Sequence, residues 1–169
     1  PVDILVNNAG TNRAGSLAQN GQRDIDDLVA LNLTALLHAT RLSLPGMIAR
    51  NRGHIVNIGS MSGLYHHDGN ATYSATKAAV HALTGQIRLD VHGKRIRVTE
   101  ICPGRTETEI FGLVIGDPAE AKKKFFDGYE TLKPNDIADA VVYAVSAPSH
   151  VNIGTIEILP TFQVAGGLR

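Results

Sequence analysis

Short apolar runs alternate with longer segments of helical spacing, and this alternation constrains the fold more than any other feature of the sequence. The apolar runs predict strands at Ile4–Asn8, His54–Ile58, Arg97–Cys102 and Thr155–Leu159. The segments between them predict helices at Gln22–Arg50, Asn70–His92 and Asn135–Ala147. Strands that alternate with helices form βαβ units, with parallel strands and helices on both faces of the sheet. The sequence therefore predicts an α/β fold with a doubly wound parallel sheet, in one domain over residues 1–169.

Composition and charge limit the classes of partner. The formal net charge is zero and 43% of the residues are hydrophobic, which indicates a soluble globule without a basic surface for nucleic acid. No run approaches the roughly 20 apolar residues of a membrane span. Cys102 is the only cysteine, so no intrachain disulfide can form, which fits a reducing compartment. We therefore expect a cytoplasmic protein with neither a nucleic-acid nor a membrane partner.

Tyr73 and Lys77 lie four residues apart at the start of a predicted helix, and Ser60 follows a predicted strand. A spacing of four places two side chains on one face of a helix. A nearby ammonium group favours the phenolate and lowers a tyrosine pKa from about 10 by roughly 1–3 units, which would let Tyr73 exchange protons. Ser60 could hold the reacting oxygen by a hydrogen bond. Taken alone, most pairs with this spacing are a packed ring and a solvated amine.

Three polar or glycine-containing features follow predicted strands directly: Asn7–Gly10, Ser60 and Pro103-Gly104. In open parallel sheets, ligands bind beyond the carboxyl ends of the strands. Because the three features share this edge of the sheet, we expect them to form one site.

The same residues carry a family resemblance. Its marks, in chain order, are Asn7-Asn8-Ala9-Gly10 after a strand, Asn32 in the next helix, Ser60, Tyr73-Ser74-Ala75-Thr76-Lys77, and Pro103-Gly104 followed by Thr108. Over essentially the whole chain this pattern resembles the short-chain dehydrogenase/reductase family, one-domain oxidoreductases with a Rossmann-type fold. The resemblance implies hydride transfer between NAD(P)(H) and a small alcohol or carbonyl substrate, without a metal.

The resemblance also implies roles for individual residues. Tyr73 corresponds to the catalytic acid/base, and Lys77 to the lysine that tunes it and holds the nicotinamide ribose. Ser60 corresponds to the serine that orients the carbonyl, and Asn32 to the asparagine that supports a proton path to the lysine. The residues implied in cofactor binding, besides Tyr73 and Lys77, are Asn8, Ala9, Gly10, Pro103, Gly104, Thr106 and Thr108.

One departure from the family is large. The glycine-rich Thr-Gly-x-x-x-Gly-x-Gly turn that holds the cofactor pyrophosphate does not occur in this sequence. We expect that roughly the first third of a family member is missing, with its first three strands and the residue that selects NAD or NADP. The 169 residues alone are then expected to bind cofactor poorly.

The end of the chain bears on the cofactor and substrate. Asp136-Ile137-Ala138-Asp139-Ala140 and Ile158-Leu159-Pro160-Thr161 with Gln163 resemble NADP-dependent reductases of small 3-hydroxy acids and related alcohols. This similarity favours NADP, with NAD as the alternative.

Several residues keep alternative interpretations. Asn32 could be a buried polar residue bonded to backbone, and Thr108 could cap a helix. His66 and His67 could be exposed or face the substrate. Arg105 could bind a substrate carboxylate or be solvated.

A second function remains open, because the chain could be a non-catalytic relative or a fragment that serves in oligomer assembly. The resemblance implies a homo-oligomer, a dimer or tetramer, built on the helices that follow Asn20 and Asn70. The intact set of Ser60, Tyr73 and Lys77 favours the enzyme.

Overall fold

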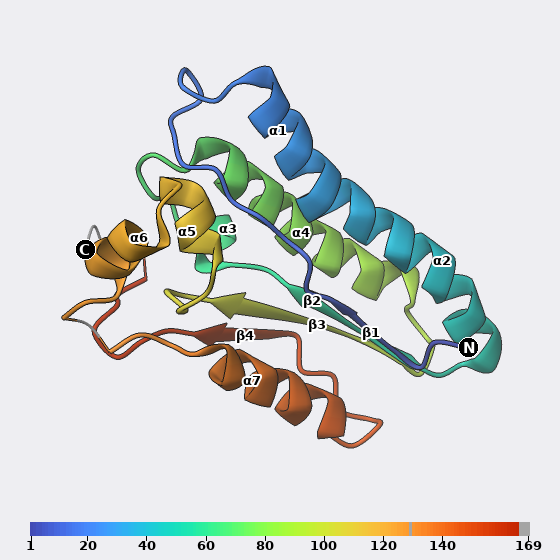
Figure 1. Cartoon of the computed structure of the whole chain (residues 1–169). Coiled ribbons are helices and arrows are strands. Elements are labelled where there is room, and N and C mark those ends of the chain that lie inside the picture. Colours follow the sequence, from blue (N-terminus) through green and yellow to red (C-terminus); the bar gives the residue numbers. More distant parts are fainter. Residues whose placement is uncertain (129, 166–169) are drawn as a thin grey trace.

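A computed structural model describes residues 1–128 and 130–165 of the chain (Figure 1). Within these described residues, four parallel strands form one sheet in the order β1-β2-β3-β4. Their bounds are β1 Ile4–Asn7, β2 Gly53–Ile58, β3 Ile96–Pro103 and β4 Thr155–Ile158. The predicted α/β fold with a parallel sheet is confirmed, and each strand agrees with its predicted position to within one residue.

Helices connect successive strands and lie on both sides of the sheet (Figure 1). On one side lie α1, η1, α2 and α4, which Figure 1 shows above the strands, and on the other lies α7. The bounds are α1 Gln22–Val29, η1 Ala30–Thr34, α2 Ala35–Arg50, α4 Ala71–Asp90 and α7 Pro134–Ser146. Three short helices, α3 Met61–Leu64, α5 Ile110–Ile115 and α6 Pro118–Phe125, lie at the end of the molecule toward which the strands point.

The apolar core lies between the sheet and the helices α2 and α4. Its buried residues are Met47 of α2, Ile55 of β2, Ile96 and Val98 of β3, Ile87 of α4 and Val91. Gly53 opens β2 directly beneath Met47, where a Cβ atom would come within 2.5 Å of the Met47 Sδ. The small residue therefore lets the helix pack closely on the strand.

The long helix before β2 differs from its prediction in its buried face. Its middle, η1, is a π-helical turn, which holds more residues per turn than an α-helix. The wide turn keeps residues four apart on one line, and the buried residues in this stretch are Leu28, Asn32, Leu36 and Thr40. The helical spacing of apolar residues also predicts Val29, Leu31 and Leu37 as core positions, but all three are exposed. Pro45 predicts a break or kink near the end of this helix, but α2 continues through it to Arg50.

The polar residues 63–69 predict a loop, but Gly63 and Leu64 belong to α3. The long mixed segment 106–133 contains α5 and α6, and the predicted position of Lys122-Lys123-Lys124 on an exposed helix face is confirmed in α6. Asn70 is the N-cap residue of α4, the role that this residue type predicts, although its side chain makes no capping hydrogen bond.

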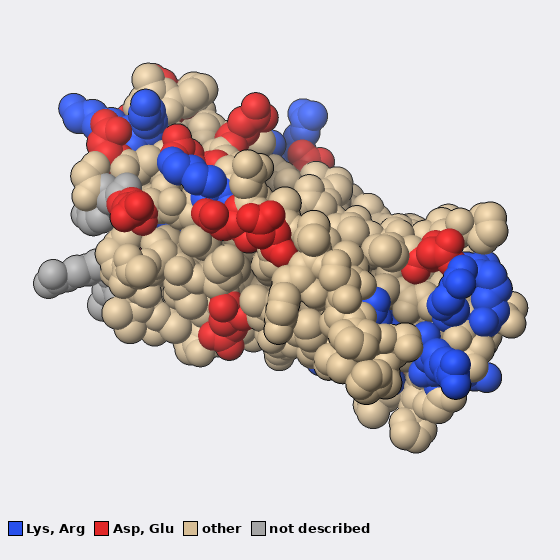
Figure 2. Space-filling model, turned by 90° about the horizontal axis from the view of Figure 1, so that it is seen from below, with Lys and Arg blue, Asp and Glu red and all other residues tan. Residues whose placement is uncertain are grey.

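The apolar run at Ile4–Asn8 predicts a buried strand, but β1 is only partly buried. Ile4 and Val6 of β1 are 49% and 41% exposed. Helix α7 packs on β3, and a helix about 10 Å wide spans only about two strands spaced roughly 4.8 Å apart. Figure 2 shows this lower face as largely uncharged in its middle, with charged side chains gathered toward its two ends. Among the described residues, no helix combines the length and apolar character needed to cross a bilayer.

Candidate active site

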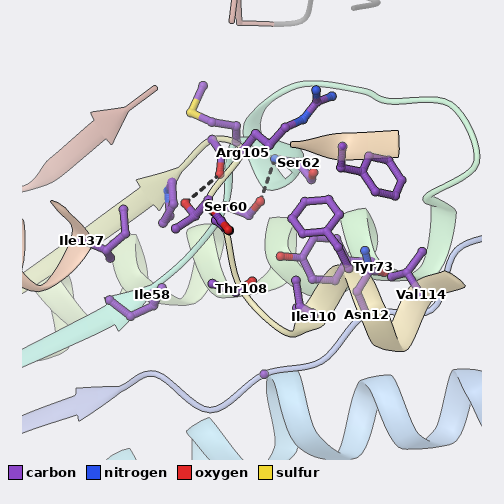
Figure 3. A pocket seen from close by; sticks show the side chains of 18 of the residues that line it. Asn12, Ile58, Ser60, Ser62, Tyr73, Arg105, Thr108, Ile110, Val114 and Ile137 are labelled. Carbon is purple, nitrogen blue, oxygen red and sulfur yellow. Dashed lines mark hydrogen bonds between the residues drawn. The ribbon is translucent and has the colours of Figure 1, made fainter. Parts of the chain in front are cut away.

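A pocket of about 1620 Å³ lies at the carboxyl ends of the strands, enclosed on one side by α5 and α6. It contains nine of the eleven residues proposed from the sequence: Asn8, Gly10, Ser60, Tyr73, Lys77, Pro103, Gly104, Thr106 and Thr108. The two others, Ala9 and Asn32, do not line it. Figure 3 shows Ser60 and Tyr73 directed into this cavity, with Ile110 and Val114 of α5 in its wall.

Ser60 is fixed by the turn that ends β2. It is the N-cap residue of α3, and its Oγ accepts a hydrogen bond of 3.1 Å from the backbone N–H of Ser62. Because the N–H uses only an acceptor site of the hydroxyl, the Ser60 proton remains available to donate toward the pocket.

Tyr73 and Lys77 lie in the first two turns of α4 and face the pocket together. The Lys77 Nζ donates a hydrogen bond of 2.8 Å to the backbone carbonyl of Ile58 and lies 5.8 Å from the centre of the Tyr73 ring. The predicted stacking of the two side chains on one helix face is therefore present, and the carbonyl at the end of β2 anchors the amine.

The pKa of Tyr73 departs from the sequence-based expectation. Burial raises this pKa above its usual value, and a hydrogen bond with the Ser60 side chain opposes the change only in part. Burial also lowers the pKa of Lys77 to about 8. The attraction between ammonium and phenolate, which the spacing of the two residues suggests, is outweighed by the loss of water around both groups, which disfavours each charged form.

Asn32 links the segment after β1 to α4. Its Oδ1 accepts a hydrogen bond of 2.8 Å from the Thr11 N–H, and its Nδ2 donates to the Thr11 carbonyl and to Thr76 Oγ1. The side chain is buried within η1, and π-helical turns are frequent at functional sites. A Cβ atom at Gly10 would lie 3.3 Å from Asn32 Oδ1 and 3.6 Å from Lys77 Nζ, so Asn32 lies next to the pocket rather than in it.

The segment after β3 approaches the end of the chain closely. A Cβ atom at Gly104 would come within 2.5 Å of Gln163 Oε1, which also accepts a hydrogen bond of 2.7 Å from the Arg105 N–H. Thr106 is buried and donates to the Gly104 carbonyl. Thr108 lines the pocket, and the N-cap of α5 is Glu109, so the alternative role of Thr108 as a helix cap is not observed.

The outer wall of the pocket combines aromatic and basic side chains. The Arg105 guanidinium lies 5.9 Å from the ring centres of both Phe125 and Phe162. His67 lines the pocket, and burial together with the charge of Arg105 lowers its pKa, whereas His66 is exposed and lies outside. Of the two alternatives for the histidines, exposure therefore applies to His66 and a position facing the pocket applies to His67.

Sequence reasoning missed two features of this region. Asn12 lines the pocket, and its buried Oδ1 has no hydrogen-bond partner within the described part of the chain. Glu100 of β3 is buried behind the site and lies 2.6 Å from His81. Asn12 lies two residues after the Asn7–Gly10 motif and could have been suspected, but no sequence pattern joins His81 to Glu100.

Comparisons with known proteins place the chain among oxidoreductases. Residues 1–116 match the family model described as short chain dehydrogenase. The chain is 41% identical to an uncharacterized short-chain type dehydrogenase/reductase, y4eK, of Sinorhizobium fredii, and 39% identical to the NADP-dependent 3-hydroxy acid dehydrogenase YdfG of Escherichia coli. Each alignment covers 99% of this chain and 68% of the relative.

The same relationship holds for solved structures. The closed form of a serine dehydrogenase complexed with NADP+ superposes with a TM-score of 0.94 at 39% identity, covering 99% of this chain and 68% of that one. A short-chain dehydrogenase from Sphingobium yanoikuyae in complex with NADPH superposes with a TM-score of 0.78 at 29% identity, covering 96% of this chain and 59% of that one.

Proposed function

Because the chain belongs to the short-chain dehydrogenase/reductase family, we propose that it is the catalytic part of an NADP-dependent oxidoreductase that interconverts a small hydroxy acid and its carbonyl form. The observation that carries this proposal is the convergence of Ser60, Tyr73 and Lys77 on one pocket at the carboxyl ends of a parallel sheet. NADP is the cofactor named for the related YdfG proteins and for the similar serine dehydrogenase structure.

The residues present fit one end of such a cofactor. The pocket is larger than the roughly 300–1,000 Å³ usual for a small ligand, which leaves room for a cofactor end together with a substrate. Gly10 keeps the space above Lys77 Nζ free of a side chain. Lys77 and Tyr73 would hold the ribose, and Pro103, Gly104 and Thr106 would lie beside the nicotinamide. Poor binding of cofactor by the 169 residues alone stays a prediction.

The bound cofactor would supply the hydride chemistry, and the protein would position the substrate and move the proton. In the reductive direction Ser60 donates a hydrogen bond to the carbonyl oxygen, and Tyr73 donates a proton to the same oxygen. A raised Tyr73 pKa keeps the phenol protonated before the reaction and so suits a proton donor. Lys77 in its ammonium form then stabilises the phenolate that is left.

Asn32 acts next to this proton path rather than in the pocket. Its three hydrogen bonds to Thr11 and Thr76 fix the segment after β1 against α4, one residue before Lys77. We assign Asn32 a positioning role, which combines the two interpretations that the sequence left open.

We infer the substrate class from the outer wall of the pocket. Arg105 lines the pocket and lies 5.9 Å from the centres of two aromatic rings, and a guanidinium can bind a carboxylate in bidentate fashion. A hydroxy acid or serine-like substrate would offer that carboxylate, in line with the names of the relatives.

The test is a Tyr73→Phe substitution in the full-length protein, assayed by NADPH absorbance with serine and 3-hydroxy acids. Loss of the proton donor is expected to lower kcat by roughly 10²–10⁴-fold. Tyr65→Phe is the matched control, because Tyr65 lies at the end of α3 and does not line the pocket. Undiminished turnover by Tyr73→Phe would remove Tyr73 from the mechanism.

A second candidate function, self-association, is favoured by one observation. Six large apolar side chains of α1, η1, α2 and α4 are exposed: Val29, Leu31, Leu37, Leu42, Ile48 and Leu89. The family resemblance implies a dimer or tetramer built on these helices, and the role is compatible with catalysis.

A further inference from the structure

Glu100 is a buried carboxylic acid that the proposed mechanism does not use. It lies in the middle of β3, is 1% exposed, and faces α4 together with Val98 of the core. Its Oε2 lies 2.6 Å from the Nδ1 of His81. Its Oε1 is buried as well and has no hydrogen-bond partner among the described residues. A buried polar atom without a partner costs free energy, so this oxygen calls for a functional explanation.

The unpartnered oxygen and the Lys77 amine lie beside neighbouring residues of the backbone. Tyr73, Lys77 and His81 follow each other at intervals of four residues, so they share one face of α4. Glu100 Oε1 lies against Gly59, in the position that a Cβ atom of Gly59 would need. Lys77 Nζ is bonded to the carbonyl of Ile58, the residue just before Gly59. The carboxyl group and the amine therefore lie beside the same two-residue stretch of backbone, and Glu100 acts electrostatically on Lys77.

We propose that Glu100, held in place by His81, is a positioning residue that keeps Lys77 in its ammonium form. The inference rests on the proposed function, because it assigns Glu100 a purpose through the role of Lys77 in that mechanism. Glu100 itself touches neither substrate nor cofactor, since it does not line the pocket.

The electrostatic surroundings of Lys77 support this assignment. Burial lowers the pKa of Lys77, negative charge on Cys102 and Glu100 opposes this change, and the resulting pKa is about 8. Burial raises the pKa of the Cys102 thiol far above neutrality, so Cys102 carries no charge when Lys77 titrates. The raised pKa of Tyr73 leaves that group neutral too. We therefore assign to Glu100, whose Oε2 contacts His81, the negative charge that opposes the effect of burial on Lys77.

The test measures the Lys77 pKa directly by NMR titration of isotope-labelled lysine in the 169-residue chain, with the signal assigned through Lys77→Arg. Glu100→Gln keeps the shape of the side chain and removes its charge, and it is expected to lower the Lys77 pKa by at least about 0.5 unit. Glu100→Asp keeps the charge and should retain most of the wild-type value. Glu157→Gln is the matched control, because Glu157 is an exposed carboxylate on the neighbouring strand β4.

An unchanged Lys77 pKa in Glu100→Gln would overturn the proposal. The unsubstituted chain offers a second measurement if the variant does not fold: the carboxyl carbon signal of Glu100 should report a carboxylate throughout the Lys77 titration, and a neutral acid there would overturn the proposal as well. In the full-length enzyme, Glu100→Gln should also move the alkaline limb of the kcat/KM profile to lower pH. Activity of Tyr73→Phe would contradict the proposed function and leave the NMR result untouched.

Discussion

One glycine, Gly63, lets helix α4 pack closely against the turn that carries Ser60. Gly63 of α3 faces the backbone of Lys77, and a Cβ atom there would lie 2.7 Å from the Lys77 carbonyl carbon and oxygen. Because the obstacle is backbone inside α4, it cannot turn aside as a flexible side chain could. Gly85 lies in the same helix with nothing within 4 Å of its hypothetical Cβ atom.

These two glycines give opposite predictions for the same substitution. Gly63→Ala is expected to lower the free energy of unfolding by about 1–3 kcal/mol through overpacking. Gly85→Ala should raise it by roughly 0.5–1 kcal/mol, because alanine loses less backbone entropy in a helix. Urea denaturation of both variants measures the two values. Equal effects of the two changes would contradict the close contact between α3 and α4.

At the scale of elements, α2 and α4 serve two surfaces at once. Their inner residues pack on the sheet and position Lys77, while outer residues such as Leu42 and Leu89 are 71% and 69% exposed. Single exposed apolar residues are ordinary, but several on adjacent helices are typical of an interface. The proposed oligomer would bury them, and the catalytic helix would then be supported from both sides.

Leu42→Glu tests this interface. Placing a charge on the outer face of α2 is expected to shift the protein from oligomer to monomer, as measured by light scattering after size exclusion. The stability of the folded monomer should change by less than about 0.5 kcal/mol, because the site is exposed. Lys94→Glu, in the exposed turn after α4, provides the control and should leave the mass unchanged. A monomeric unsubstituted protein would refute the proposed oligomer.

At the scale of the whole molecule, a buried histidine ties three segments of the sheet region together. Thr99 Oγ1 donates its proton to the Ile153 carbonyl, so it must accept the hydrogen bond of 2.8 Å from His54 Nε2. His54 Nδ1 is therefore the unprotonated nitrogen, and it is buried without a partner in the described structure. Burial, followed by the positive charge of Arg97, lowers the pKa of His54 to about 4.

This histidine is expected to make the fold sensitive to acid. The unfolded chain binds a proton near pH 6.5 and the folded chain only near pH 4, so stability is full above about 6.5 and falls as the pH decreases toward 4. The loss attributable to His54 is about 3 kcal/mol. In His54→Gln, the fall in unfolding free energy between these pH values should be smaller by that amount. His92→Gln, an exposed histidine, should retain the full fall, and an equal slope in all three proteins would contradict the assignment.

The sequence by itself determined the strands, the helices and most of the pocket. The alternation of apolar runs and the four-residue spacing of Tyr73 and Lys77 are local patterns, and covalent backbone geometry turns them into strands and helix faces. The strand-end position of Ser60 and Pro103-Gly104 then followed from the parallel arrangement alone.

Only the tertiary structure decided the burial, the contacts and the pKa of each group. The raised pKa of Tyr73, the exposure of Ile4 and the contact of His81 with Glu100 all depend on which atoms from distant parts of the chain exclude water. The π-helical turn at Asn32 likewise moved the buried face of its helix away from the regular spacing. Burial and contacts between distant segments are properties of packing, and no local pattern in the sequence encodes them.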